Sequence, residues 1–312
     1  MTPRTEVDVG GVSLRNPILA ASGTFGYGLE FVPFFDLREI GGFVTKGLSL
    51  RPLAGTHPHR IVETPGGMLN AIGLQNVGVE AFVAERLPAL REAGATVVAN
   101  VFGETVEEYA EVAAILDTAD GVAAIELNVS CPNVRRGGML FGQDPEGLGQ
   151  VVAAARRATR KPLWTKLTPN VTDLVRLARV AEGEGSDALC LVNTYSGMAV
   201  DIETRAPVIR FGSGGLSGPA IKPMALWAVY QVAPQVKVPV IGIGGIARLS
   251  DALEFLLVGA RAVQVGTANY IEPDVSARIA RGLPAWLAAR GVADVNEFVG
   301  TIERPHAARV EP

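Results

Sequence analysis

The side chains best suited to chemistry stand at the ends of short apolar segments of the chain. They are two lysines and three asparagines: Lys46, Asn100, Asn128, Lys166 and Asn193. Side chains alternate along a strand, so Lys46 shares a face with Val44, and Lys166 shares one with Trp164. A single polar residue at such a position commonly ends a strand in solvent. Five at equivalent positions predict two ammonium groups and three amides converging on one ligand site.

A cysteine three residues beyond one of these segments is a candidate base. Cys131 lies in the polar loop that follows Asn128. A thiol with an ordinary pKa of about 8.5 can act as a base or a nucleophile near neutral pH. A lone cysteine is usually a buried structural residue, and Cys190, within the apolar Ala188–Val192, fits that description. No histidine is near Cys131 in the sequence to form a nucleophile pair, so we favour a base role for it.

Two glycine-rich turns late in the chain could hold a phosphate. Gly244 and Gly245 follow the seventh apolar segment, and Gly266 and Thr267 follow the eighth; a further glycine-rich stretch covers residues 212–218. In barrels of parallel strands, the turns after the last two strands commonly hold a phosphate through backbone N–H groups. Any tight turn can contain glycine, so the placement of these turns, more than their composition, favours phosphate binding.

Eight apolar segments rich in valine and isoleucine could position these groups as strands. They are Pro17–Ala21, Gly42–Lys46, Thr96–Val101, Ala123–Asn128, Pro162–Leu167, Ala188–Asn193, Pro239–Ile243 and Ala262–Val265. Helical periodicity lies between most of them, in Val77–Ala93, Thr105–Leu116, Gly147–Thr159, Val171–Gly183, Ile221–Val232 and Leu249–Leu257. Apolar strands that alternate with helices indicate a parallel sheet covered on both faces, and eight such units predict an α/β fold of the (β/α)8 TIM-barrel type. The rival is an open doubly wound sheet, whose glycine fingerprint residues 21–26 match poorly.

The remaining stretches predict how the two ends of the barrel are built. Val7–Arg15, with Gly10 and Gly11 at its centre, predicts an N-terminal hairpin that could close the bottom of the barrel. Three connections are too long to be plain turns: Gly47–Asn76, Val129–Glu146 and Thr194–Pro219. Each follows a strand, so we expect long loops at the C-terminal rim, where the active sites of barrels are built.

Bulk properties argue against several classes of protein. The 312 residues are 48% hydrophobic and 19% charged, which makes disorder improbable and fits one barrel domain spanning residues 1–312. The net charge of −4 without a long basic run argues against nucleic-acid binding, and the lack of a long apolar window argues against a membrane span. The opening residues do not match a signal peptide, and two cysteines are too few for a disulfide framework, so we expect a cytoplasmic protein. His57, His59 and His306 form no zinc pattern, so we expect no metal.

Several motifs together resemble the dihydroorotate dehydrogenases, in consistent order along nearly the whole chain up to about Asp274. They are ASGTFG (21–26), TKG (45–47), GMLNAIGLQN (67–76), LNVSCPN (127–133), KLTPN (166–170), NT (193–194), GLSGPAIKP (215–223) and VQVGTA (263–268). In this family, cysteine at the base position marks the soluble class 1 enzymes, whereas membrane-associated class 2 enzymes have serine there. The loop from Cys131 to Gly138 is most similar to class 1B, although Arg135 and Arg136 stand where a lysine is common.

The resemblance implies a flavin enzyme of de novo pyrimidine biosynthesis that oxidises (S)-dihydroorotate to orotate. Cys131 would remove a proton as hydride passes to FMN, and Lys166 would stabilise the reduced flavin electrostatically. The implied FMN contacts are Ser22, Lys46, Gly47, Asn100, Asn128, Lys166, Val192, Gly218, Gly244, Gly245, Gly266 and Thr267. The implied dihydroorotate site comprises Lys46, Asn70, Ala71, Ile72, Gly73, Leu74, Asn128, Asn193 and Thr194.

The resemblance also implies partners. Class 1B enzymes have a homodimeric core joined to an FAD- and iron–sulfur-containing electron-transfer subunit that reduces NAD, and together these form a heterotetramer. Three alternatives stay open: a class 1A enzyme that passes electrons to fumarate, a dihydropyrimidine dehydrogenase-like flavoenzyme, and a barrel that binds a phosphorylated metabolite without redox chemistry. Lys46 and the segment Gly67–Asn70 favour a carboxylated substrate over uracil or thymine.

Overall fold

Eight parallel strands close into a barrel in the computed structural model, which describes residues 2–129 and 141–304. Pairing follows chain order around the ring and ends where β16 pairs with β3. The strands are β3 (Ile18–Ala20), β4 (Gly42–Val44), β7 (Val97–Val101), β8 (Val122–Asn128), β9 (Leu163–Lys166), β10 (Ala188–Leu191), β15 (Val240–Ile243) and β16 (Ala260–Val265). All eight lie at the predicted apolar segments, so the (β/α)8 prediction is confirmed.

Helices cover the outside of the barrel because each presents an apolar stripe to the strands. They are α1 (Val79–Ala81), continued by the π-helical η3 (Phe82–Arg86) and by α2 (Leu87–Glu92), then α3 (Val106–Asp117), α4 (Pro145–Ala158), α5 (Leu174–Gly183), α6 (Lys222–Val232), α7 (Leu249–Leu257) and α8 (Val275–Ala288). The sequence did not predict α8, which packs against β3 and completes the ring. The connection from β3 to β4 has only the 3-10 turns η1 (Leu29–Phe31) and η2 (Leu37–Glu39).

The predicted N-terminal hairpin lies under the amino ends of the strands. It consists of β1 (Val7–Val9) and β2 (Val12–Leu14), paired antiparallel. Gly10 at its tip has φ 57°, and a Cβ there would lie 2.4 Å from the carbonyl oxygen of Asp187, the residue before β10. Only glycine combines this left-handed conformation with so close an approach, so the tip is fixed against the barrel bottom.

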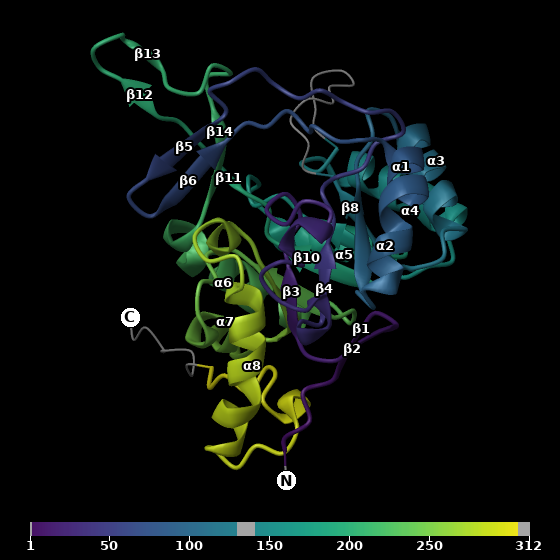
Figure 1. Cartoon of the computed structure of the whole chain (residues 1–312), viewed down its shortest axis with the longest axis vertical. Helices are drawn as coiled ribbons and strands as arrows, with labels where there is room; N and C mark the ends of the chain where they lie inside the picture. The colour runs from purple at the N-terminus through teal and green to yellow at the C-terminus, as the bar shows by residue number, and fades with distance from the viewer. Residues whose placement is uncertain (1, 130–140, 305–312) are drawn as a thin grey trace, which may run out of the picture.

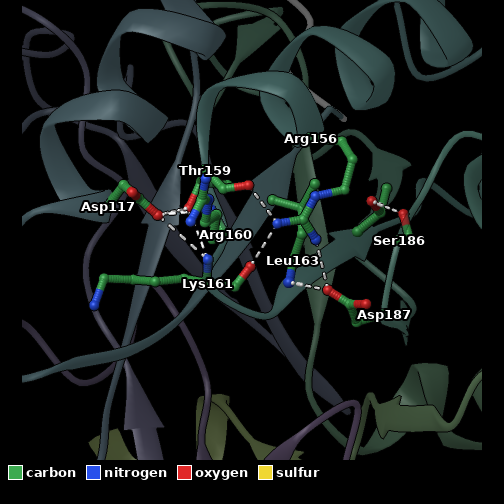
Figure 2. Close-up of polar contacts among 9 residues, drawn as sticks. Asp117, Arg156, Thr159, Arg160, Lys161, Leu163, Ser186 and Asp187 are labelled. Carbon is green, nitrogen blue, oxygen red and sulfur yellow. Dashed lines mark hydrogen bonds and ion pairs between the residues drawn. The ribbon is translucent and has the colours of Figure 1, made fainter.

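A hydrogen-bonded network holds the loops at this same end (Figure 2). At the end of α3, the Asp117 carboxylate accepts hydrogen bonds from the Thr159 hydroxyl at 2.7 Å and from the Arg160 backbone N–H at 2.6 Å. Arg156 of α4 pairs with Asp187 at 2.8 Å. Because these contacts lie at the end of the barrel opposite the strand carboxyl ends, we assign them to stability.

Two of the expected long loops at the C-terminal rim contain strands that the sequence did not predict. β5 (Ile61–Thr64), β6 (Gly67–Asn70), β11 (Tyr195–Gly197) and β14 (Gly214–Ser217) form an antiparallel sheet in the order β11-β14-β6-β5. β12 (Val200–Asp201) pairs with β13 (Ala206–Pro207) in a short ribbon. The central pairing, Leu216 opposite Leu69, joins segments far apart in the sequence. The sequence of either loop alone is therefore not enough to predict its strands.

The accessory sheet and the ribbon gather at one end of the barrel, and the N terminus lies at the other (Figure 1). The short 3-10 helices η4 (Pro219–Ile221) and η6 (Thr267–Tyr270) follow β14 and β16 at the sheet end. η5 (Ala233–Gln235) and η7 (Val295–Glu297) follow α6 and α8. Within the described ranges, no helix is both long enough and apolar enough to cross a membrane.

Candidate functional site

A cavity of about 360 Å³ opens at the carboxyl ends of the barrel strands. Its floor comes from the barrel, and one wall comes from the accessory sheet, through Asn70 of β6 and Gly215 of β14. Asn70 also joins these strands, because its side-chain N–H donates to the Gly215 carbonyl at 3.2 Å. The volume is that of a site for a small organic ligand, at the place where barrels carry such sites.

All five polar side chains from the strand ends line this cavity: Lys46, Asn100, Asn128, Lys166 and Asn193. Lys166 is 5% exposed and Asn100 is fully buried, so both form the floor. Asn193 donates a side-chain hydrogen bond to the Asn128 amide oxygen at 3.2 Å. The alternation of side chains along each strand therefore does direct these groups to one place, while their roles in binding stay predictions.

Lys46 carries its charge in poorly solvated surroundings. Burial lowers the pKa of its ammonium group below the ordinary value of 10.5, and the nearby positive charge of Arg60 lowers it further. An anion bound beside Lys46 would oppose both effects. This lysine is therefore suited to receive a carboxylate or another acidic group within the cavity.

The predicted phosphate turns lie together on the barrel side of the cavity. Gly244, Gly245, Gly266 and Thr267 follow β15 and β16, and Gly218 precedes η4. Gly245 has φ 71°, and a Cβ there would lie 2.9 Å from the Gly218 carbonyl oxygen. No side chain fits at Gly245, so the main chain of these turns stays close to the cavity, as phosphate binding requires.

The predicted substrate segment lines the same cavity. Asn70, Ala71, Ile72, Gly73 and Leu74 line it, as do Thr194 and the remaining predicted flavin contacts Ser22, Gly47 and Val192. Gly73 has φ 71°, and a Cβ there would lie 2.6 Å from the backbone of Thr56. Glycine is therefore required where this segment turns against its neighbour, and the turn shapes the cavity wall.

Sequence reasoning missed several residues of the site. Asn170 lines the cavity and joins its neighbours: it donates to the Thr194 carbonyl at 3.1 Å and accepts from the Ser196 N–H at 3.0 Å. It belongs to the motif KLTPN, and a polar residue just after a strand end was a usable signal. Thr24, Phe102, Thr168, Ser217 and Tyr270 also line the cavity.

A buried polar cluster beneath the cavity was missed as well. Glu126 and Gln264 are fully buried inside the barrel, on β8 and β16. The signal was a charged residue within an otherwise apolar strand, because such a residue is rarely buried without partners. Cys190 is buried next to this cluster, and burial and then the Glu126 carboxylate raise the pKa of its thiol well above the ordinary value. Cys190 is therefore an unreactive interior residue, as expected from its sequence neighbours.

Cys131, the candidate base, lies outside the described residues, and no contact is assigned to it. Val129 before that segment and Gly142 and Gln143 after it line the cavity. In the part of the chain that the structure describes, no three histidine, cysteine or acidic side chains gather as metal ligands.

Known proteins resemble this chain over nearly its whole length. The sequence profile of one family, described as dihydroorotate dehydrogenase, matches residues 4–287. A protein of Trichlorobacter lovleyi is 57% identical over 303 residues, which cover 97% of this chain and 100% of that protein. One of Pelobacter propionicus is 58% identical with the same coverage, and one of Geotalea daltonii is 54% identical over 96% of this chain and 99% of its own. All three carry the name dihydroorotate dehydrogenase B (NAD(+)), catalytic subunit.

Proposed function

Because the chain belongs to the dihydroorotate dehydrogenase family, we propose that it oxidises dihydroorotate to orotate in the cavity at the barrel mouth, as a step of pyrimidine biosynthesis. The observation that carries this proposal is the set of groups around one cavity. Two lysines and three asparagines line it together with a cluster of glycine turns. Such a set suits a cofactor with a phosphate and a ring beside a small acidic substrate.

The described residues fit FMN as that cofactor. The turns at Gly218, Gly244 and Gly266 would receive the phosphate at the end of the cavity where backbone is closely packed. The amide oxygen of Asn100 is buried and has no hydrogen-bond partner within the described residues. A flavin ring carries an N–H group that would satisfy it, and FMN, when bound, supplies an acceptor for hydride.

The remaining lining residues would hold dihydroorotate. The Lys46 ammonium would pair with the substrate carboxylate, since burial and then Arg60 lower its pKa and a bound anion would oppose both effects. The amides of Asn70, Asn128 and Asn193 both donate and accept hydrogen bonds, as a ring with carbonyl and N–H groups requires. Lys166 in the floor would stabilise negative charge that develops on the ring below the substrate.

We assign the proton transfer to Cys131. Its thiolate would accept a proton from a ring carbon of dihydroorotate while hydride leaves the neighbouring carbon, so that a carbon–carbon double bond forms. The support for this assignment is chemical type and chain position, since both flanks of its segment line the cavity. Serine at this position would be a much weaker base.

Reduction of the bound flavin by dihydroorotate, followed by stopped-flow absorbance across a range of pH, tests the proposal. Wild-type protein should be reduced by dihydroorotate and not by dihydrouracil, and C131S should need a much higher pH for the same rate. C190A, which removes the other thiol, should keep the wild-type pH profile. A protein that takes up no FMN would contradict the flavin assignment and favour a non-redox barrel. Unchanged kinetics in C131S at neutral pH would remove Cys131 from the mechanism.

We further propose that the electrons leave through a separate FAD- and iron–sulfur-containing subunit to NAD, with this chain forming a homodimeric core in the cytoplasm. The shared name of the relatives supports this acceptor, because it specifies NAD and a catalytic subunit. Purification from the native host should yield a complex with flavin and iron–sulfur absorbance that reduces NAD. Reoxidation of the isolated chain by fumarate at a comparable rate would favour a class 1A enzyme.

A further inference from the structure

Glu126 is a fully buried carboxylate that none of the steps above uses. It lies on β8, two residues before Asn128, so both side chains are on the strand face that points into the barrel. A buried charge without partners costs several kcal/mol, so the groups around it decide what it does.

Three other strands supply those groups. Oxygen Oε1 of Glu126 accepts a hydrogen bond from the Asn100 side-chain nitrogen at 2.7 Å and lies 4.0 Å from the Lys166 ammonium nitrogen. Oxygen Oε2 accepts one from the Gln264 side-chain nitrogen at 2.7 Å. Asn100 and Lys166 line the cavity and Glu126 does not, so the carboxylate contacts the cavity floor from beneath.

These contacts determine which way the amide of Asn100 faces. An ionised carboxylate can only accept hydrogen bonds, so Asn100 must turn its NH2 group to Glu126 and its oxygen away. That oxygen, Oδ1, has no partner within the described residues, and a Cβ on Gly47 would lie 3.0 Å from it. Gly47 also lines the cavity. Glu126 thus contacts two residues of the cavity floor, Asn100 through its amide nitrogen and Lys166 through its ammonium group, and leaves the Asn100 oxygen for another partner.

We propose that Glu126 is a positioning residue, which turns the Asn100 oxygen towards the bound ring and holds the Lys166 ammonium beneath it. This inference rests on the proposed function. The amide oxygen matches a ring N–H, and the ammonium favours the reduced ring, which carries negative charge. The carboxylate offsets part of the ammonium charge, so Glu126 sets how strongly the site prefers the reduced cofactor over the oxidised one.

A purely structural role for Glu126 makes a different prediction. Loss of a structural contact weakens binding of oxidised and reduced FMN alike, and the ratio of the two dissociation constants stays the same. Loss of the positioning role changes that ratio, because only one form carries the charge that responds to Lys166.

The test measures that ratio in E126Q. Apo-protein is titrated with oxidised FMN in air and with chemically reduced FMN under anaerobic conditions. The dissociation constant for oxidised FMN divided by that for reduced FMN should rise at least tenfold over wild type, because the ammonium loses its counter-charge and Asn100 can turn. A tenfold change corresponds to a flavin midpoint potential about 30 mV more positive for a two-electron couple. An unchanged ratio in a folded variant overturns the proposal.

D117A serves as the matched control, since it removes a part-buried hydrogen-bonded network at the opposite end of the barrel. It should lower stability and leave the ratio within twofold of wild type. If wild-type apo-protein binds neither form of FMN, the proposed function and this inference fail together. If wild type binds FMN and is reduced by dihydroorotate while the E126Q ratio is unchanged, the positioning role alone fails.

A second pair of variants covers the case in which E126Q does not fold. K166Q leaves the buried carboxylate without its cation, whereas the double variant E126Q/K166Q replaces both charges with neutral amides, a change that buried ion pairs often tolerate. The double variant should melt at a higher temperature than K166Q, and its FMN ratio should be higher than that of K166Q, because the carboxylate that opposes negative charge on the ring is gone. Equal melting temperatures, or equal FMN ratios, overturn the proposal.

Discussion

Replacement of Gly218 by alanine tests how the accessory sheet and the phosphate turns are joined. Gly218 has φ 98°, and a Cβ there would lie 2.6 Å from the Cα of Gly67 and 3.2 Å from the Gly66 carbonyl oxygen. Neither neighbour can move freely. Gly67 pairs with Thr64 across the β5–β6 hairpin, and the Gly66 carbonyl accepts a hydrogen bond from the Ala220 N–H at 2.8 Å. The added methyl group therefore meets backbone that is held in place.

Two effects add in G218A. Alanine in a left-handed conformation costs roughly 1–2 kcal/mol, and a methyl group forced into packed backbone costs roughly 1–3 kcal/mol more. If the turn moves to relieve the clash, FMN can bind only after the turn has returned to its wild-type conformation, and the free energy of that return is lost from binding. A coupling of about 1–3 kcal/mol weakens the affinity roughly 5- to 150-fold.

G291A is the matched control. Gly291 also has a positive φ, 69°, but it follows α8 on the surface, and a Cβ there would meet no atom within 4 Å. Urea unfolding of the apo-proteins should show a loss of roughly 1–2 kcal/mol for G291A from the left-handed conformation alone, and a larger loss for G218A. FMN titration followed by fluorescence should give wild-type affinity for G291A and the weakened affinity for G218A. Equal stability and equal FMN affinity in the two variants would refute the reasoning.

Three further predictions follow from the charges and the burial of particular side chains. Burial and then Arg60 lower the pKa of Lys46, so orotate affinity should fall as the pH rises through that lowered pKa, at a pH below the ordinary 10.5. In a titration followed by flavin absorbance, K46R should show no such fall, because arginine keeps its charge. The same fall in K46R would refute this assignment of the pH dependence to Lys46. D117A should cost roughly 0.5–1.5 kcal/mol in urea unfolding at pH 7, because the part-buried Asp117 carboxylate loses its hydrogen bond from Thr159, against at most about 0.5 kcal/mol for D120A at an exposed ion pair. Hydrogen bonds from the loop after α4 lower the pKa of Asp117, so the D117A difference should shrink as the pH falls below 3.8 through that lowered pKa; a constant difference would argue against it. Cys190 should resist iodoacetamide in the native protein, as seen by mass spectrometry, and its rapid labelling would show that it is not buried.

Much of the barrel could be predicted from the sequence because its signals are local. Each barrel strand is a short apolar run buried on both faces, and most runs are followed by a helix-forming segment, so the pattern repeats within the chain. The polar residues at the strand ends could be assigned to one rim, because alternation along a parallel strand determines the face and the end at which a side chain appears. That logic accounts for Lys46 and Lys166 in the same cavity.

The missed elements depend on contacts between distant segments. The accessory strands are short and partly exposed, and β6 pairs with β14 across about 145 residues of chain, as the Asn70–Gly215 hydrogen bond shows. Antiparallel pairing of this kind leaves only a weak local pattern. The turn at Gly218 is glycine because Gly67 lies against it, and no property of either segment alone reveals that approach.

The sequence by itself therefore determined the barrel, the rim at which the polar groups appear, and the family to which the chain belongs. Only the tertiary structure decided how those groups act on one another. Glu126 looked like one charge in an apolar strand, and its significance depends on Asn100, Lys166 and Gln264, which three other strands bring to its two oxygens. Strand periodicity determines which face a side chain occupies. Distances between side chains on different strands depend on how the barrel closes, and closure is a property of the whole chain.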